Sequence, residues 1–215
     1  MTFVPSPLYV ICDVDVCERA GWTPLDFAAA CLDGGATCLQ IRAKHAASGW
    51  LLQCAEAVVA RAAAYDDAVV IVNDRADIAR LSGARGVHVG QEDLTPAAVR
   101  WIVGGDALVG LSTHTREQLA DALSEPVSYV AIGPVFGTDT KATGYAAVGL
   151  DGVRAAAHTA RARGVPVVAI GGITLDRAQS VLDAGADAVA VITDLLVAGD
   201  PRARVAAYLG LLSRV

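Results

Sequence analysis

The stretch Leu182-Asp183-Ala184-Gly185-Ala186, followed by the apolar run 187–192, shows how the chain is built. The glycine lies where a helix would end, and the run after it is short and almost wholly apolar, like a parallel strand covered on both faces. A second unit of this kind, Leu32-Asp33-Gly34-Gly35-Ala36, precedes another strand-like run at 37–42. The repeated unit favours a barrel in which helices and strands alternate.

Eight strand-like runs alternate with helical patterns along the chain. An open dinucleotide-binding sheet would also alternate, but its first strand leads into G-x-G-x-x-G, whereas here that strand ends in Cys12-Asp13-Val14-Asp15. Eight strands, each followed by a helix, predict an α/β fold, a single-domain (β/α)₈ TIM barrel over residues 1–215, without a linker or domain boundary. The expected strands are 8–12, 37–42, 69–73, 86–89, 107–111, 128–132, 166–170 and 187–192.

Composition excludes several classes of protein. The 215 residues are 54% hydrophobic, and their net charge of −6 without a basic tract argues against nucleic acid as a partner. No apolar run approaches the roughly 20 residues of a membrane span, and the first five residues lack the features of a signal peptide. The five cysteines form no C-x-x-C and lie mostly in apolar segments. They are predicted to be reduced core residues of a cytoplasmic protein, and a zinc site is not expected.

Three polar side chains alternate along the strand-like run near residue 40: Gln40, Arg42 and Lys44. Alternate residues of a strand point to the same face, so an amide and two cations lie together. A cationic row at the end of an apolar strand is costly to bury without an anion, and the run contains no Asp or Glu. Either these charges reach solvent, or they bind an anionic ligand; an Arg fork beside a Lys point charge suits phosphate or pyrophosphate.

Polar residues at the carboxyl ends of the strands form the active site of such a barrel. Asp74, within Asn73-Asp74-Arg75, and Asp93 follow neighbouring strands, so their carboxylates can converge. Two carboxylates a few ångströms apart repel unless a proton or a cation lies between them, and Mg²⁺ is commonly held by one or two carboxylates plus substrate phosphates. We therefore predict Asp74 and Asp93 as Mg²⁺ ligands; the alternative for each is to cap the next helix.

The ends of the last two strands have the pattern of a phosphate site. Gly171-Gly172 and Ile192-Thr193 offer backbone N–H groups beside a short helix N-terminus, which is the shared phosphate site of barrels. Close packing of a tight turn is the alternative for the two glycines. The segment 137–144, rich in Gly and Thr and carrying Lys141, is predicted to be a mobile loop that covers phosphate.

The histidines and tryptophans give weaker signals. His88 lies within a strand and is expected to be a core residue. His114, two residues after Ser112, could orient its loop or transfer a proton. Trp50 and Trp101 are predicted to be buried and structural. No Ser-His-Asp or Cys-His spacing indicates a protein nucleophile.

Taken together, these motifs resemble the thiamine-phosphate synthase family. They occur in family order and span nearly the whole chain, and as a set they are highly specific. The matching stretches are Gln40-Ile41-Arg42-Ala43-Lys44, Val72-Asn73-Asp74-Arg75, His88-Val89-Gly90-Gln91-Glu92-Asp93, Gly110-Leu111-Ser112-Thr113-His114, Gly133-Pro134-Val135-Phe136, Thr138-Asp139-Thr140-Lys141 and Ala169-Ile170-Gly171-Gly172-Ile173.

The resemblance implies a transferase of thiamine biosynthesis that joins hydroxymethylpyrimidine diphosphate to thiazole phosphate and releases pyrophosphate. The family reaction is dissociative and Mg²⁺-assisted, and it uses no protein nucleophile. By resemblance, the pyrimidine diphosphate is bound by Gln40, Arg42, Lys44, Asn73, Ser112 and Lys141, and of these Arg42, Lys44, Ser112 and Lys141 take part in catalysis. Mg²⁺ is held by Asp74 and Asp93, and the thiazole phosphate by Thr138, Thr140, Gly172, Ile192 and Thr193.

The chain departs from the family pattern at three positions. Thr193 stands where the family often has Ser, which keeps a hydroxyl and a backbone N–H. Asp194 follows directly, and its carboxylate would repel a phosphate unless it points away. Val148 stands where a Pro usually precedes Gly-Leu, which puts the rigidity of that loop in doubt.

Two other functions fit a barrel of this kind. A thiazole tautomerase of the same fold would need a proton-transfer residue such as His114 but not the carboxylate pair. A non-catalytic sensor of a phosphate ligand would have lost at least one metal or pyrophosphate residue. Since Asp74, Asp93 and Lys141 are all present, the sequence favours the synthase; it leaves open a homo-oligomer.

Overall fold

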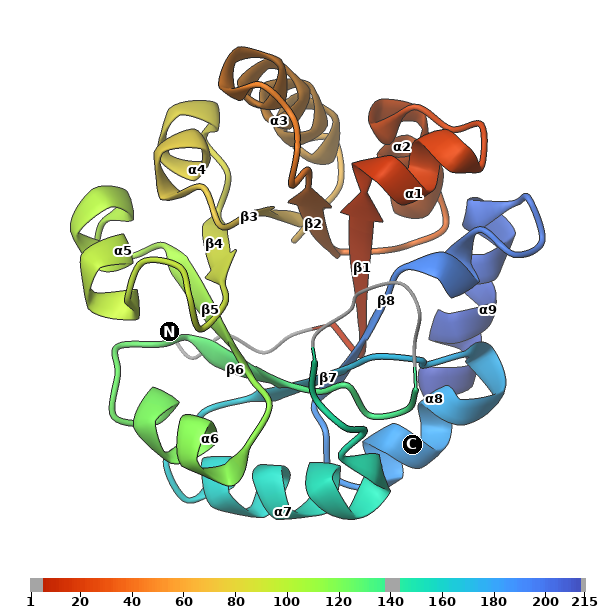
Figure 1. Cartoon of the computed structure of the whole chain (residues 1–215). Helices are drawn as coiled ribbons and strands as arrows, with labels where there is room; N and C mark the ends of the chain where they lie inside the picture. Colours follow the sequence, from red (N-terminus) through yellow and green to blue (C-terminus); the bar gives the residue numbers. More distant parts are fainter. Residues whose placement is uncertain (1–5, 138–143, 214–215) are drawn as a thin grey trace.

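A computed structural model of the chain describes residues 6–137 and 144–213. Eight parallel strands pair in sequence order and β8 pairs with β1, which closes the barrel inside a ring of helices (Figure 1). The predicted (β/α)₈ barrel is therefore confirmed. The strands are β1 (Leu8–Asp13), β2 (Cys38–Arg42), β3 (Val69–Asn73), β4 (Gly86–Val89), β5 (Leu108–Thr113), β6 (Tyr129–Ile132), β7 (Val167–Ile170) and β8 (Ala188–Val191).

The helices begin at recognisable capping residues. The Thr23 and Thr95 hydroxyls accept backbone N–H groups of α2 and α5 at 3.1 and 3.3 Å, and a proline follows each cap. The short element α1 was not predicted, because it has too few residues for a helical pattern, whereas η1 is the short helix expected at Ile192-Thr193. The helices are α1 (Val14–Arg19), α2 (Pro24–Asp33), α3 (Ser48–Ala62), α4 (Ala76–Ser82), α5 (Pro96–Val103), α6 (Arg116–Ala122), α7 (Gly149–Arg161), α8 (Leu175–Asp183), η1 (Thr193–Leu195) and α9 (Pro201–Leu212).

The core has two layers, set by the alternation of side chains along the strands. In β1, Leu8 and Val10 join the large apolar layer between barrel and helices. Tyr9 and Ile11 point to the other face and join a smaller cluster inside the barrel. The interior is therefore filled by side chains, some of them polar, and the site lies at the carboxyl ends of the strands above them.

The prediction that the tryptophans are buried is wrong. Trp101 of α5 is 93% exposed and Trp50 of α3 is 41% exposed. The buried residues of α5 are Pro96, Val99 and Val103, whose spacing of three and four defines the face that packs on the barrel. Trp101 lies outside that stripe.

The five cysteines all carry free thiols, four of them buried and Cys54 half-buried, as predicted for core residues. Burial raises the pKa of the Cys31 and Cys38 thiols. Within the described residues, no helix has the length and apolar character that crossing a membrane requires.

Candidate functional site

The polar row Gln40, Arg42 and Lys44 begins in β2 and ends two residues beyond it, so it runs from the barrel interior to the rim. Gln40 is buried with 3% exposed, whereas Lys44 lies at the rim. Both cations have a carboxylate partner from a neighbouring strand end: Arg42 pairs with Asp13, and Lys44 pairs with Asp74. The strand ends of β1 and β3 therefore supply carboxylates to both cations, an arrangement that was not among the alternatives considered from the sequence. The ligand-binding roles of these residues stay predictions.

Asp13 is a residue that sequence reasoning missed. Its carboxylate is buried, caps α1 by accepting the Val16 N–H at 3.1 Å, and forms the ion pair with Arg42. Strand register brings the two residues together, since Asp13 and Arg42 are paired neighbours in β1 and β2. The available signal was its position at a strand end, where the other polar site residues also lie.

The predicted metal ligands Asp74 and Asp93 lie close together beyond β3 and β4. Asp93 accepts the Gly90 N–H at 2.7 Å, while the Asp74 backbone N–H donates to the His88 carbonyl at 2.7 Å. Neither carboxylate caps the helix that follows, because Arg75 and Thr95 hold those positions. Burial raises the pKa of Asp74, and the neighbouring Asp93 raises it further, while the Lys44 ammonium opposes the shift.

A polar pocket of about 310 Å³ contains this pair, and its chemistry fits a divalent cation. Of the described residues that line it, one is a cation and three are acids, so negative charge is in excess. Mg²⁺ needs only one or two carboxylates, since water and substrate phosphates complete its coordination shell. The Lys44 ammonium contacts Asp74, which shows that a positive charge can be placed beside this carboxylate. The lining residues are Lys44, Asn73, Asp74, Gly90, Gln91, Glu92, Asp93, Ser112, His114 and Tyr145.

A second pocket of about 190 Å³ lies at the ends of β7 and β8 and has a mostly apolar lining. It brings together the predicted phosphate residues Gly171-Gly172 and Ile192-Thr193. The tight packing expected as the alternative for the glycines is also present: a Cβ on Gly172, at φ +63°, would lie 2.6 Å from the Gly137 carbonyl oxygen. Ser112 lines both pockets, so the two meet at the end of β5.

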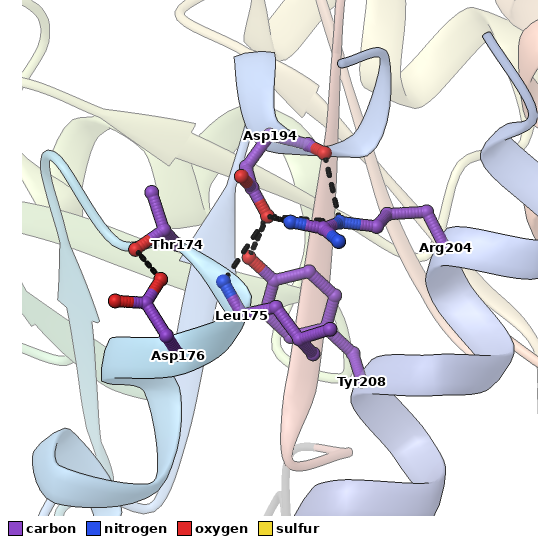
Figure 2. A network of polar contacts seen from close by, with 6 residues as sticks. All are labelled: Thr174, Leu175, Asp176, Asp194, Arg204 and Tyr208. Atoms are coloured by element: carbon purple, nitrogen blue, oxygen red, sulfur yellow. Dashed lines mark hydrogen bonds and ion pairs between the residues drawn. The ribbon is translucent and has the colours of Figure 1, made fainter. Parts of the chain in front are cut away.

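Asp194 borders the second pocket without presenting an unbalanced charge to it. Figure 2 shows its carboxylate among partners from α8 and α9. Oδ2 accepts from Arg204 Nη2 at 2.7 Å, from the Tyr208 hydroxyl at 2.5 Å and from the Leu175 N–H at 3.2 Å. Burial raises the pKa of Tyr208, and the adjacent carboxylate adds to the shift. The Arg204 guanidinium thus offsets the repulsion that the Asp194 carboxylate was expected to exert on a phosphate at Thr193.

Below the two pockets, buried polar side chains form a continuous chain through the barrel. Gln40 Nε2 donates to the Tyr9 hydroxyl at 2.9 Å, which lies 2.9 Å from the Tyr129 hydroxyl. The Tyr129 hydroxyl is 3.0 Å from His88 Nδ1, and His88 Nε2 is 2.8 Å from Ser112 Oγ. His88 is buried as predicted, yet it also contacts a site residue. Sequence reasoning missed both tyrosines, because a tyrosine inside an apolar strand is read as core.

His114 and Val148, two further residues at the rim, each make a hydrogen bond to a backbone carbonyl. His114 Nδ1 lies 2.6 Å from the Gly133 carbonyl oxygen, and its ring stacks on Tyr145 with centroids 4.2 Å apart. Val148, in place of the usual Pro, donates its N–H to the Pro134 carbonyl at 2.8 Å. A proline has no N–H and could not make this bond. Val148 therefore lacks the fixed φ of a proline but gains a hydrogen bond that holds the loop. The predictions for Thr138, Thr140, Lys141 and their covering loop lie outside the described residues.

Comparison with known proteins places these features in one family. The model of the family described as thiamine monophosphate synthase matches residues 8–195. A thiamine-phosphate synthase of Koribacter versatilis is 44% identical over 207 residues, 95% of each chain, and one of Mycolicibacterium gilvum is 46% identical over 87% of this chain and 81% of its own. The solved thiamine phosphate pyrophosphorylase from Pyrococcus furiosus superposes with a TM-score of 0.85 at 31% identity, covering 96% of this chain and 95% of that chain. The chain therefore belongs to the thiamine monophosphate synthase family.

Proposed function

We propose that this chain joins hydroxymethylpyrimidine diphosphate to thiazole phosphate and releases pyrophosphate, as a thiamine-phosphate synthase. The observation that carries the proposal is the pair of pockets that meet at Ser112. One is polar and holds acids beside a cation, and the other is mostly apolar with a Gly-Gly turn at its wall. A coupling enzyme needs two adjacent sites of different chemistry, because its two substrates must bind at once.

The polar pocket takes the diphosphate of the first substrate. Lys44, Asn73 and Ser112 line it and offer donors to phosphate oxygens. Arg42, held in place by Asp13, is the last residue of β2 and precedes Lys44 by two positions, and its guanidinium offers further N–H donors to the leaving group. Lys141 keeps its predicted place on the same diphosphate by resemblance to the family.

Asp74 and Asp93 would hold Mg²⁺ in this pocket. When bound, the ion supplies positive charge that stabilises the pyrophosphate leaving group. The Lys44 ammonium contacts Asp74, so an ion held by this carboxylate would share it with Lys44.

The apolar pocket takes the thiazole phosphate, with its ring against the apolar wall and its phosphate near Gly171-Gly172 and Ile192-Thr193. The C–O bond of the pyrimidine substrate breaks, and its electron pair leaves with pyrophosphate. The electron-rich aminopyrimidine carries the cation until the thiazole nitrogen attacks it. The protein's part is to orient the two rings and to keep water from the cation, because water would capture it.

The proposal is tested by measuring pyrophosphate release with each substrate alone and with both. Release that needs both substrates, needs Mg²⁺ and stops with a chelator is the expected result. Release from the pyrimidine diphosphate alone would mean hydrolysis, and a changed thiazole without pyrophosphate would mean the tautomerase. Binding of either phosphate ligand without turnover would favour the sensor; each of these outcomes contradicts the proposal.

A further inference from the structure

We propose that the buried chain Gln40–Tyr9–Tyr129–His88–Ser112 runs in one direction and holds the Ser112 hydroxyl as a hydrogen-bond donor toward the phosphate ligand of the polar pocket. The inference rests on the proposed function only for the identity of that ligand. Tyr9, Tyr129 and His88 then act as positioning residues, since they reach the ligand through Ser112.

The direction of the chain follows from the first donor. Gln40 donates an amide N–H to the Tyr9 oxygen, so the single Tyr9 proton is free to go to the Tyr129 oxygen. The Tyr129 proton then goes to His88 Nδ1. Burial raises the pKa of both tyrosines, which keeps the two hydroxyls protonated as this scheme requires.

The tautomer of His88 is the consequence. A neutral imidazole that accepts at Nδ1 carries its proton on Nε2, and Nε2 lies 2.8 Å from Ser112 Oγ. Nε2 therefore donates to Ser112, and the Ser112 proton is left to point elsewhere. The reverse direction would require the Gln40 amide to turn over so that its oxygen accepts from Tyr9, and His88 would then be protonated on Nδ1.

Ser112 lies where its hydroxyl proton can be donated in a hydrogen bond to a ligand. It is half-buried and lines both pockets, whereas the four residues behind it are buried, with at most 8% exposed. A hydroxyl that already accepts from His88 offers its proton to an acceptor in the pocket, and a phosphate oxygen is such an acceptor. A donor oriented before the ligand arrives needs no rearrangement when it binds.

The packing around the chain leaves its members little freedom. The Tyr129 ring lies over the bare backbone of Gly110, where a Cβ would be 2.1 Å from Tyr129 Cζ and 2.5 Å from His88 Nδ1. The Tyr129 and His88 rings are stacked with centroids 5.6 Å apart, and Tyr9 meets Tyr129 edge-on at 6.0 Å. Gly110 thus makes room for the contact between Tyr129 and His88.

The direction is tested without turnover, by ¹⁵N NMR of the histidine rings in the ligand-free protein. The chain has four histidines, so the His88 signals can be assigned with His88→Gln. We expect the Nε2–H tautomer. The Nδ1–H tautomer would overturn the proposed direction, whatever the enzyme assay shows.

The link to Ser112 is tested by the binding of inorganic pyrophosphate with Mg²⁺, measured by calorimetry. Tyr129→Phe should weaken this binding about tenfold in the wild-type background and have almost no effect when Ser112 is already Ala, because the effect passes through Ser112. Equal losses in both backgrounds would overturn the link. Tyr65→Phe, which removes a hydroxyl that binds Asp33 far from the site, is the matched control.

Tyr9→Phe serves if Tyr129→Phe does not fold, since it breaks the same chain one step earlier. Failure of the coupling assay alone would contradict the proposed function but leave both of these results standing. A wild-type protein that binds no pyrophosphate would overturn the role of Ser112 as well, while the NMR result would still report the direction.

Discussion

The network around Asp194 allows a quantitative prediction, because it ties three elements to one buried carboxylate. Arg204→Met should destabilise the protein by about 2–3 kcal/mol. Removing one partner of a buried pair typically costs about 3–5 kcal/mol, and the loss expected here is smaller because the Arg204 side chain is 24% exposed and therefore partly screened by solvent. The Asp194 carboxylate would also keep the Tyr208 hydroxyl and the Leu175 N–H.

Urea unfolding and thermal melts measure the effect. For a chain of this size, each kcal/mol corresponds to roughly 2–4 °C in Tm, so a fall of about 4–12 °C is expected. The matched control is Arg154→Met, which breaks the exposed pair with Asp151 on α7 and should cost no more than about 0.5 kcal/mol. Equal effects of the two variants would refute the idea that the Asp194 network is a stabilising junction.

The same change should alter ligand binding. Without Arg204, the Asp194 charge faces the phosphate pocket uncompensated, and thiazole phosphate should bind about tenfold more weakly, which corresponds to about 1.4 kcal/mol. Asp194→Asn combined with Arg204→Met removes both charges and should restore most of the affinity. A double variant as weak as Arg204→Met would show that the loss comes from distortion of η1 and not from charge.

Most of the fold could be predicted because the signal in the strands is local. The eight expected strands match the eight observed strands to within two residues, since each is a near-continuous apolar run with a turn or helix stop beside it. The exposed position of Trp101 could also have been predicted, because the stripe of Pro96, Val99 and Val103 excludes it. That error came from treating a large aromatic side chain as core without checking its helical face.

The site was only partly predictable, because its contacts join residues far apart in sequence. Asp74 and Asp93 follow adjacent strands, and that adjacency was enough to predict that their carboxylates lie close together. The partner of Arg42 is Asp13, 29 positions away, and Tyr9 meets Tyr129 across 120 positions. Such pairs depend on strand register and barrel closure, which a single sequence does not give.

Three further changes test the site. Arg42→Ala should weaken the pyrimidine diphosphate in calorimetry and also lower stability, because it leaves the buried Asp13 carboxylate without its ion pair; an unchanged melting curve would contradict this. Gly110→Ala should destabilise the barrel by about 1–3 kcal/mol in urea unfolding, since its Cβ would overlap the Tyr129 ring. Asp93→Asn should abolish Mg²⁺-dependent activity and lower the pKa of Asp74, because it removes a charge that raises that pKa. In the wild type, Mg²⁺ should bind more weakly as the pH falls through the raised pKa of Asp74, since protonation removes a ligand. The raised pKa of Asp74 also stabilises the folded protein at low pH. This contribution to the free energy of unfolding is complete below the usual aspartate pKa and is lost as the pH rises through the raised pKa. A carboxyl ¹³C NMR titration of Asp74 checks the direction, and an identical titration curve in Asp93→Asn would show that the two carboxylates do not interact.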